Sequence, residues 1–350
     1  MRKAHTLTSY LREMARLCPY FIIVFPFLLA GCSENAPTSP GGAGSGTVYI
    51  AGWVDMDSNG AKATIWKNGV ANILPGTGNS MANAVFVHKG DVYAAGVSVI
   101  TNTSGYSVSV ATYWKNGTKY VLSNVTSFAK DIWVSGNNVI VVGTLSYSPN
   151  GSGDTAAIWI NGNQQTLSSY ISHANACFVS GSDVYVGGMA PQGHRAIWKN
   201  GMPQLLGTSD GGYVTDIFVS GNDVYASCSQ VSYSSYGFPS RWTQGIWKNG
   251  QKIHELTGNN ITNISSLFVS NNTVYAVGRY NNVATYWKNG VATQMPFFIP
   301  EGISVYNNEV HIVGSVGSNY SIRAIYYKNG TPYTLSAARS EAYGIYIVGQ

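Results

Sequence analysis

A six-residue phrase recurs along this chain at a nearly constant spacing, and this repetition constrains the fold more than any other feature. Close copies are TIWKNG at Thr64–Gly69, TYWKNG at Thr112–Gly117 and Thr285–Gly290, AIWKNG at Ala196–Gly201 and GIWKNG at Gly245–Gly250. With two divergent copies included, the anchor residues are Trp66, Trp114, Trp159, Trp198, Trp247, Trp287 and Tyr327. The steps between them run from 39 to 49 residues. A period of this length built from short β segments is typical of a β-propeller, so we predict seven blades.

A second phrase stands in register with the first, as in DIWVSGNNVIVVG at Asp131–Gly143. Each unit then contains four strands, with a sharp SGND-type turn after the first and an Asn-Gly turn after the third. Asn-Gly between two apolar runs is the strongest short-range hairpin signal, because both residues tolerate the positive φ of a type I′ turn. Adjacent bulky residues such as Tyr113 and Trp114 predict that both faces of the third strand are covered. Helical periodicity is absent beyond residue 46, so the predicted fold class is all-β.

The two ends of the repeating region complete one another. TVYIAG at Thr47–Gly52 matches a second strand that lacks its first, and AYGIYIVG at Ala342–Gly349 matches a first strand that lacks its second. We therefore expect residues 47–350 to form a seven-bladed propeller of four-stranded blades, with the C-terminal strand completing the N-terminal blade. Such closure protects an edge strand that could otherwise pair with another chain.

These motifs resemble bacterial extracellular propeller repeats of the HAF type, which alternate a W-x-x-G hairpin, a leucine and a G-x-V-V-G-like strand. The likeness to kelch propellers is looser, and their paired glycines are matched at Gly187-Gly188. The resemblance covers Thr47–Gln350 and implies the propeller fold. It implies no particular activity, because propellers host many unrelated functions.

The N-terminal segment reads as an export signal. Four basic residues precede an apolar run at Tyr20–Ala30 that is too short to span a bilayer as a stable helix. Leu29-Ala30-Gly31-Cys32 resembles the lipobox of bacterial lipoproteins, which implies removal of the signal peptide at residues 1–31 and lipid attachment at Cys32. An ordinary signal peptide is the alternative. Ser33 replaces the aspartate of inner-membrane retention, which implies the outer membrane, and residues 32–46 form a lipidated flexible linker.

Charge argues against one class of partner, nucleic acid, and the positions of the cysteines predict the state of their thiols. Residues 1–31 carry +3 of the formal net charge of +5, so the mature chain is near +2 and has no Lys/Arg run. We therefore expect no nucleic-acid binding, and we expect a monomer. Cys177 and Cys228 stand within strand patterns, which predicts two buried thiols; a disulfide between neighbouring strands is the alternative.

Variable loops are predicted to carry the function. The SGND and WKNG turns share one rim of the propeller because strands alternate in direction, which leaves the variable loops on the other rim. Function usually resides on such loops held by a rigid scaffold. The candidate ligand-binding residues are Tyr106, Tyr147, Tyr233, Tyr236, Trp242, Tyr280 and Tyr320. Aromatic rings beside amides and hydroxyls suit glycan or protein recognition, whereas the alternative is that they pack the loops.

One loop matches the start of a calcium site. In the sequence DMDSNG, Asp55, Asp57 and Asn59 would present alternate oxygens to one ion. Trp66 stands where an EF-hand needs a glutamate, so that loop type is excluded, and a solvent-exposed turn is the alternative. No other cofactor is expected.

The remaining polar residues point to no catalytic constellation. Asp131 and Asp216 share a first-strand position and could face a central channel, but they belong to non-adjacent blades. The acids at Asp91, Asp183, Asp223 and Glu309 share a turn position and are predicted to be structural. No metal-spaced histidines and no nucleophile motif occur. We expect a lipid-anchored envelope module that acts without catalysis as a binding or scaffold module for a protein or glycan. A polysaccharide hydrolase or lyase is the alternative, and an accessory lipoprotein that only supports a neighbour is a third possibility.

Overall fold

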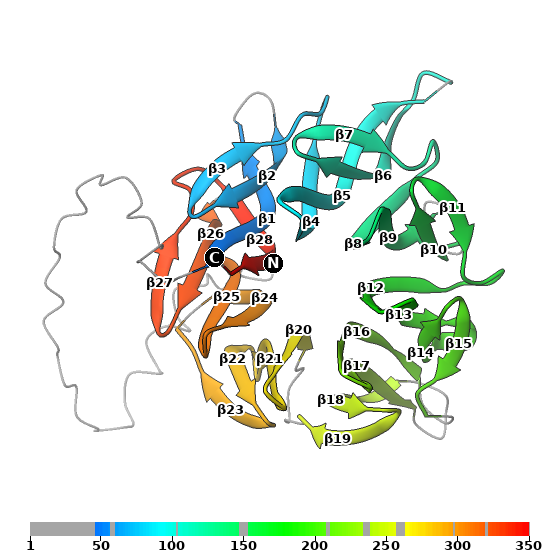
Figure 1. Cartoon of the computed structure of the whole chain (residues 1–350), viewed down its shortest axis with the longest axis vertical. Coiled ribbons are helices and arrows are strands. Elements are labelled where there is room, and N and C mark those ends of the chain that lie inside the picture. Colours follow the sequence, from blue (N-terminus) through cyan, green and yellow to red (C-terminus); the bar gives the residue numbers. More distant parts are fainter. Residues whose placement is uncertain are drawn as a thin grey trace, which may run out of the picture. The chain divides into compact units, whose positions relative to one another are not determined.

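The chain forms seven four-stranded antiparallel sheets arranged in a ring (Figure 1). This computed structural model describes residues 46–349, apart from 57–59, 103, 147–152, 208–210, 234–238, 257–262, 297 and 319–320; for 232–233 and 239–242 it describes only the backbone. Among these residues, helical structure is limited to the 3-10 turn η2 (Pro191–Gly193) and 3-10 geometry at Ser321, and no helix is long and apolar enough to cross a bilayer. The predicted all-β class and seven blades are confirmed. The predicted signal peptide, Cys32 and nearly all of the linker lie outside the described residues.

Each blade runs from an inner strand beside the centre of the ring to an outer strand at its edge. Blade 1 contains β28 (Ser340–Val348), β1 (Thr47–Asp55), β2 (Ala61–Lys67) and β3 (Val70–Ile73). Blade 2 contains β4 (Ser80–His88), β5 (Asp91–Thr101), β6 (Ser107–Lys115) and β7 (Thr118–Val121). Blade 3 contains β8 (Ser127–Ser135), β9 (Asn138–Leu145), β10 (Thr155–Ile160) and β11 (Asn163–Thr166). Blade 4 contains β12 (His173–Ser180), β13 (Asp183–Ala190), β14 (His194–Lys199) and β15 (Met202–Leu205).

The last three blades follow the same order. Blade 5 contains β16 (Gly211–Ser220), β17 (Asp223–Tyr233), β18 (Pro239–Lys248) and β19 (Gln251–Glu255). Blade 6 contains β20 (Asn263–Ser270), β21 (Thr273–Tyr280), β22 (Val283–Lys288) and β23 (Val291–Gln294). Blade 7 contains β24 (Ile299–Tyr306), β25 (Glu309–Val316), β26 (Arg323–Lys328) and β27 (Thr331–Thr334).

The C-terminal strand closes the ring as predicted. β28 pairs antiparallel with β1, with Val48 opposite Ile347 and Ala51 opposite Gly344. Its Ala342 side chain is fully buried in a cluster that also contains Tyr326 of blade 7. Blade 1 is therefore built from both ends of the propeller, and its core is continuous with that of the preceding blade.

The WKNG phrase forms a hairpin turn that also holds the neighbouring turn of the same blade. In blade 2, Asn116 and Gly117 have φ of 48° and 81°, as a type I′ turn requires. The Asn116 Oδ1 accepts a 2.9 Å hydrogen bond from the Val92 N–H, and Lys115 Nζ lies 2.8 Å from the Asp91 carboxylate. Hydrogen bonds from Lys115 and Asn116 hold the pKa of Asp91 below its usual value. The structural role predicted for the acids at this turn position is confirmed, and the repeated lysine has a partner rather than only solvent.

The repeated tryptophan joins adjacent blades. Trp114 is 1% exposed, and its Nε1 donates a 2.9 Å hydrogen bond to the Pro75 carbonyl, which follows the outer strand of blade 1. Trp66 makes the corresponding bond to the Leu335 carbonyl after blade 7. Since each blade lies between two others, both faces of its third strand are covered, which explains why bulky residues stand side by side in the repeat.

Candidate functional site

Every inner strand carries a β-bulge at the same position. In blade 3, Ala129 pairs with Gly143 and Asp131 pairs with Val142, so Lys130 is an extra residue without a partner on β9. The same register shift occurs in all seven blades. The seven extra residues are Asn83, Lys130, Asn175, Thr215, Ser265, Glu301 and Tyr343. Bulges re-aim side chains and are common beside functional sites.

The seven extra residues surround one cavity. It has a volume of about 200 Å³ and lies at the end of the channel where the inner strands begin, which is the variable-loop rim. We call it the channel mouth. The seven extra residues supply amides, hydroxyls, one amine, one carboxyl and one phenol, with six residue types among seven positions, and the carboxyls of Asp131 and Asp216 also line the cavity. The preceding position is apolar in every blade, whereas the chemistry of the bulge position changes from blade to blade.

The repeated glycine of the second strand permits the bulge. A Cβ added to Gly143 would lie 1.9 Å from the Phe128 carbonyl oxygen and 3.0 Å from the Ala129 Cα, both backbone atoms of the inner strand. Because the inner backbone approaches this closely, a side chain has no room there. The close inner strand therefore explains the glycine of the VYAxG phrase in six blades, whereas in blade 5 the same bulge is formed with Cys228 at this position.

An acidic cluster lies at the mouth between blades 7 and 1. Tyr343 Oη donates a short hydrogen bond to the Glu341 carboxylate and accepts one of 2.9 Å from Trp53 Nε1. Burial, together with the nearby Glu341 charge, raises the pKa of Glu301 to about 7. Burial and the bond to Glu341 also raise the pKa of Tyr343. This part of the mouth can therefore donate and accept hydrogen bonds near neutral pH.

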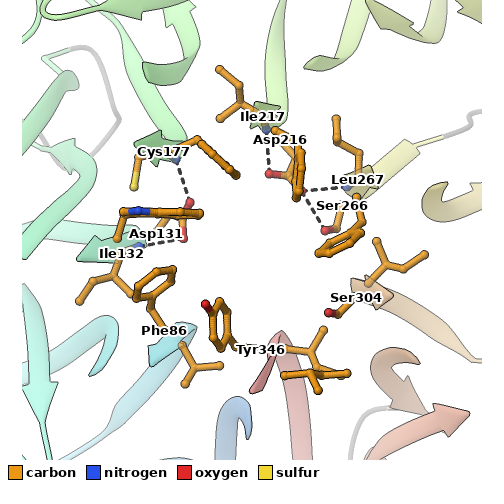
Figure 2. A pocket seen from close by; sticks show the side chains of 18 of the residues that line it. Phe86, Asp131, Ile132, Cys177, Asp216, Ile217, Ser266, Leu267, Ser304 and Tyr346 are labelled. Atoms are coloured by element: carbon orange, nitrogen blue, oxygen red, sulfur yellow. Dashed lines mark hydrogen bonds between the residues drawn. The ribbon is translucent and has the colours of Figure 1, made fainter. Parts of the chain in front are cut away.

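Asp131 and Asp216 do face the channel, and each joins two blades (Figure 2). The Asp131 carboxylate accepts 2.8 Å hydrogen bonds from its neighbour Ile132 N–H and from Cys177 N–H on the next blade. Asp216 accepts equivalent bonds from Ile217 N–H, and from Leu267 N–H on the next blade. Both oxygens of each carboxylate are thus engaged with backbone amides. Desolvation raises the pKa of Asp131 to about 7 and that of Asp216 to about 6.

Asparagine side chains join the pairs of adjacent blades that alternate with the pairs joined by Asp131 and Asp216; we call each junction between adjacent blades a seam. Asn83 Nδ2 donates a 2.7 Å hydrogen bond to the Ala129 carbonyl of blade 3, and Asn175 Nδ2 donates one of 2.8 Å to the Val214 carbonyl of blade 5. Four successive seams, from blade 2 to blade 6, are therefore closed by a polar side chain at the channel wall. These bonds fix the positions of the bulged strands relative to one another.

The half of the channel farther from the mouth has an aromatic lining. Six inner strands place a ring at the same position, and the seventh places Ser304 there. The rings form what we call the aromatic arc: Tyr346, Phe86, Trp133, Phe178, Phe218 and Phe268. Successive centroids are 4.1–4.9 Å apart. The cavity that they line has a volume of about 310 Å³.

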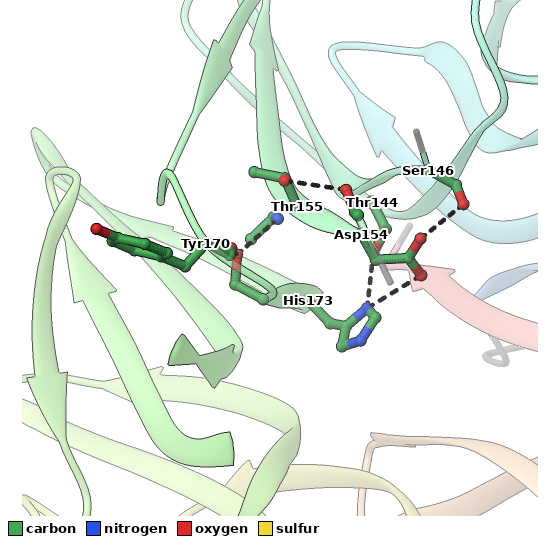
Figure 3. A network of polar contacts seen from close by, with 9 residues as sticks. Thr144, Ser146, Asp154, Thr155, Tyr170 and His173 are labelled. Carbon is green, nitrogen blue, oxygen red and sulfur yellow. Dashed lines mark hydrogen bonds and ion pairs between the residues drawn. The ribbon is translucent and has the colours of Figure 1, made fainter. Parts of the chain in front are cut away.

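A polar network closes one variable loop of blade 3 (Figure 3). Ser146 Oγ donates a 2.6 Å hydrogen bond to Asp154, and His173 Nδ1 lies 4.0 Å from the same carboxylate and 3.5 Å from Thr144 Oγ1. Burial lowers the pKa of His173. The hydroxyl and the carboxylate both approach Nδ1, so the imidazole does not relay a proton between them, and the network holds the ends of β9 and β10 together.

The predicted aromatic candidates are spread over the rim. Tyr106 is 71% exposed before β6, whereas Tyr280 is half-buried at the end of β21, on a non-adjacent blade. Of Tyr233 and Trp242, on β17 and β18, only the backbone is described. The remaining three candidates, Tyr147, Tyr236 and Tyr320, lie outside the described residues. Among the side chains that are described, no cluster of these candidates forms, and their role in binding stays a prediction.

The calcium hypothesis stays a prediction for the same reason. Asp57 and Asn59 lie outside the described residues, and the Asp55 carboxylate lies 3.6 Å from the Arg339 guanidinium. Within the described part of the chain, no group of three or more His, Cys, Asp or Glu side chains could hold a metal ion. Calorimetric titration with calcium tests the loop directly.

The two cysteines of the propeller are buried free thiols. Cys177 is 3% exposed and Cys228 is fully buried, and they form no disulfide. The predicted pair of buried thiols is confirmed and the disulfide alternative is wrong. Burial raises the pKa of both thiols, so both stay protonated.

The channel mouth was missed from the sequence, although a signal for it exists. Aligned copies of the first strand show a column that varies in chemistry between small, repeated neighbours, as in Ala-Asn-Ala at 82–84 and Ala-Lys-Asp at 129–131. Such a column inside an inner strand is unusual for a purely structural repeat.

Comparisons with known proteins identify no family. No protein-family model and no curated protein matches the chain. A similar solved structure is the computationally designed Ika8 protein, at 16% identity and a TM-score of 0.45, covering 85% of this chain and 98% of that one. Others are the acylaminoacyl peptidase of Pyrococcus horikoshii (11%, TM-score 0.49, covering 83% of this chain and 50% of the peptidase) and BamB of Moraxella catarrhalis (12%, TM-score 0.40, covering 74% and 92%). At these identities and TM-scores the likenesses carry no conclusion about function.

Proposed function

We propose that this chain is a lipid-anchored propeller of the bacterial envelope, at the outer membrane, that binds a glycan or a protein through the channel mouth without catalysing a reaction. The observation that carries this proposal is the set of seven bulges. They bring chemically different side chains from all seven blades to one cavity, in a chain whose hairpin turns and blade cores are repeated. Residues that hold the fold tend to repeat in each blade. The residue type at the bulge position is shared only by blades 2 and 4, which both have asparagine, so this variation is best explained by a ligand.

The size and chemistry of the mouth favour one polar terminal group. Its volume of about 200 Å³ is below the roughly 300–1,000 Å³ of ordinary small-molecule pockets. A single sugar ring, or one side chain of a protein partner, fits that space better than a whole ligand. Amide, hydroxyl and carboxyl groups beside the Tyr343 ring are what sugar hydroxyls and a sugar face bind.

The carboxylates of the channel support binding over catalysis. A glycosidase needs one carboxyl group that donates a proton and a second that attacks or activates water. Asp131 and Asp216 each use both oxygens to accept backbone hydrogen bonds. Glu301 also has a pKa raised to about 7, but it is the one carboxyl of the bulge positions, so it has no second carboxyl among them to act with it. Analysis of the products formed from bound glycans therefore distinguishes binding alone from the alternative of a polysaccharide hydrolase or lyase.

A glycan array tests the proposal. All described strands lie between Thr47 and Val348, so a soluble form of residues 33–350 retains every blade. We expect Lys130→Ala and Glu301→Gln to reduce the signal of the bound glycan at least about tenfold, because each removes a polar group from the mouth. The matched rim variant, Tyr106→Ala, is expected to keep it. Loss of signal in Tyr106→Ala alone would move the site to the predicted rim aromatics.

Two further results would change the proposal. Release of shortened glycans, detected by mass spectrometry, would favour the enzyme alternative. Capture of no glycan, with cross-linking of an envelope protein at residue 130, would favour the protein partner. Anchoring is tested separately by labelling cells with a fatty-acid analogue: the wild-type chain should be labelled in the outer-membrane fraction, and Cys32→Ser should not.

A further inference from the structure

We propose that the aromatic half of the channel binds a small organic cation of the quaternary ammonium class, held between the aromatic arc and the carboxylates of Asp131 and Asp216. This site adjoins the mouth but differs from it in its aromatic lining and in its ligand, and it goes beyond the function proposed above. The two cavities share the aspartates, which stand between them.

The aromatic arc provides a surface for a diffuse positive charge. Its rings come from six of the seven inner strands and touch in sequence around the channel, and all but Phe86 keep part of their surface open. The faces of aromatic rings attract cations, most strongly where water is displaced. Figure 2 shows Phe86 and Tyr346 directed into the cavity opposite the two aspartates.

Ser304 leaves the arc open at one point. Its side chain stands where the other blades have a ring, between Phe268 of blade 6 and Tyr346 of blade 1. Ser304 is 6% exposed, so the gap lies inside the channel and not at the surface. A seventh ring would complete the circle and fill space that the cavity now has.

The two acidic side chains of this cavity have no basic side chain beside them in the lining that the structure describes. Asp131 and Asp216 are acidic, and among the described residues no Lys, Arg or His lines this cavity. Their hydrogen-bond donors are backbone amides and the Ser266 hydroxyl, which are neutral. A bound cation would supply the missing charge in a region of low dielectric, where a charge pair is stronger than in water.

The arrangement favours an organic cation over a metal ion. Hard metal ions need several converging oxygens, but the carboxylate oxygens here accept backbone hydrogen bonds. A cavity of about 310 Å³ holds a tetraalkylammonium group with room to spare. Five of the six arc rings have no oxygen acceptor, which suits a cation whose charge is covered by methyl groups.

Acid should weaken the binding. Besides each other, the titratable groups that line cavities with the two aspartates are Cys177, Tyr306 and Tyr346 in the channel and Lys130, Glu301 and Tyr343 in the mouth. The Cys177 thiol stays protonated because burial raises its pKa. Glu301 titrates in the neighbouring mouth with a pKa of about 7. Since the pKa values of Asp131 and Asp216 are about 7 and 6, both are mostly ionised near pH 8 and mostly protonated near pH 5. Binding of a cation should therefore tighten as pH rises through this interval.

Calorimetric titration with choline tests the proposal on the full chain in a non-ionic detergent without a sugar headgroup. The control ligand is 3,3-dimethylbutan-1-ol, which has the shape of choline but no charge. We expect choline to bind at least about tenfold more tightly than this alcohol, and more tightly at pH 8 than at pH 5. Equal affinity for the two ligands, or no binding of either, would overturn the proposal.

Variants in the channel locate the site. Ser304→Phe adds the seventh ring and is expected to abolish choline binding, whereas Ser304→Ala, at the same position, is expected to keep it. Asp216→Asn should weaken binding about tenfold, and Phe218→Leu about fivefold. Unchanged affinity in Ser304→Phe would overturn the assignment; if that variant melts well below the wild type, unchanged affinity in a folded Phe218→Leu protein would do the same.

Discussion

Replacing Gly143 by alanine should destabilise the propeller by displacing one inner strand. The new Cβ would lie 1.9 Å from the Phe128 carbonyl oxygen and 2.9 Å from its carbonyl carbon. Both contacts are with backbone, so no side-chain rotation relieves them, and β8 must move away from β9. Overpacking of this kind costs about 2–4 kcal/mol, which corresponds to a fall of roughly 4–8 °C in Tm. Thermal unfolding followed by circular dichroism, with urea denaturation as a second measure, gives both quantities.

Gly162→Ala in the same blade is the matched control. Gly162 has a φ of 82°, but an added Cβ there meets nothing within 4 Å. Its cost is therefore only that of a left-handed conformation, about 1 kcal/mol. If Gly143→Ala melts like the wild type, or costs no more than Gly162→Ala, the glycine is not required by the bulge and the account of the repeated phrase is wrong.

Three further predictions concern the closure, the channel and the thiols. Deleting residues 342–350 removes most of β28 and should abolish the cooperative melting transition; a truncated chain that melts like the full one would refute the closure. The pKa of Asp131 is about 7 when folded and about 3.9 when unfolded, so the folded chain holds an extra proton between these values and the free energy of unfolding falls as pH rises. Asp131→Asn should flatten that slope in urea denaturation from about pH 4 to pH 8, and an equally steep slope would contradict the assignment. Cys177 and Cys228 should resist a thiol reagent in the native chain and react after unfolding; rapid native reaction would mean that the blade seams open.

The fold could be predicted from the sequence because its signals are local and repeated. The Asn-Gly turn at 116–117 has its own backbone preference, and the paired bulk of Tyr113 and Trp114 indicates the packing of the blade. Closure by β28 followed from incomplete units at the two ends. The first two signals are visible within one repeat, and the third needs only a comparison of the two ends with a complete repeat.

The candidate site could be predicted only in part, because it depends on contacts between repeats. The channel-facing aspartates were found from their shared position, but their bonds to Cys177 and Leu267 join different blades, and no single repeat shows them. The bulge at Lys130 depends on register with Gly143, which spacing alone does not give. The aromatic arc at Phe86 and its equivalents looked like ordinary core residues. The arc forms only where six inner strands from different blades meet around the channel axis, which no single repeat shows.

The bulges separate the chemistry of the mouth from the stability of the ring. A residue such as Lys130 forms no pair with the second strand, so its side chain can change without disturbing the ladder. Substitutions at such positions in distant blades should alter affinity nearly additively, while the free energy of unfolding stays almost constant. Ligand preference could then drift by single steps, each tolerated by the scaffold. The same property makes positions such as Lys130 ready targets for design, whereas Asn83 and Asn175 each hold a seam between blades and are less open to change.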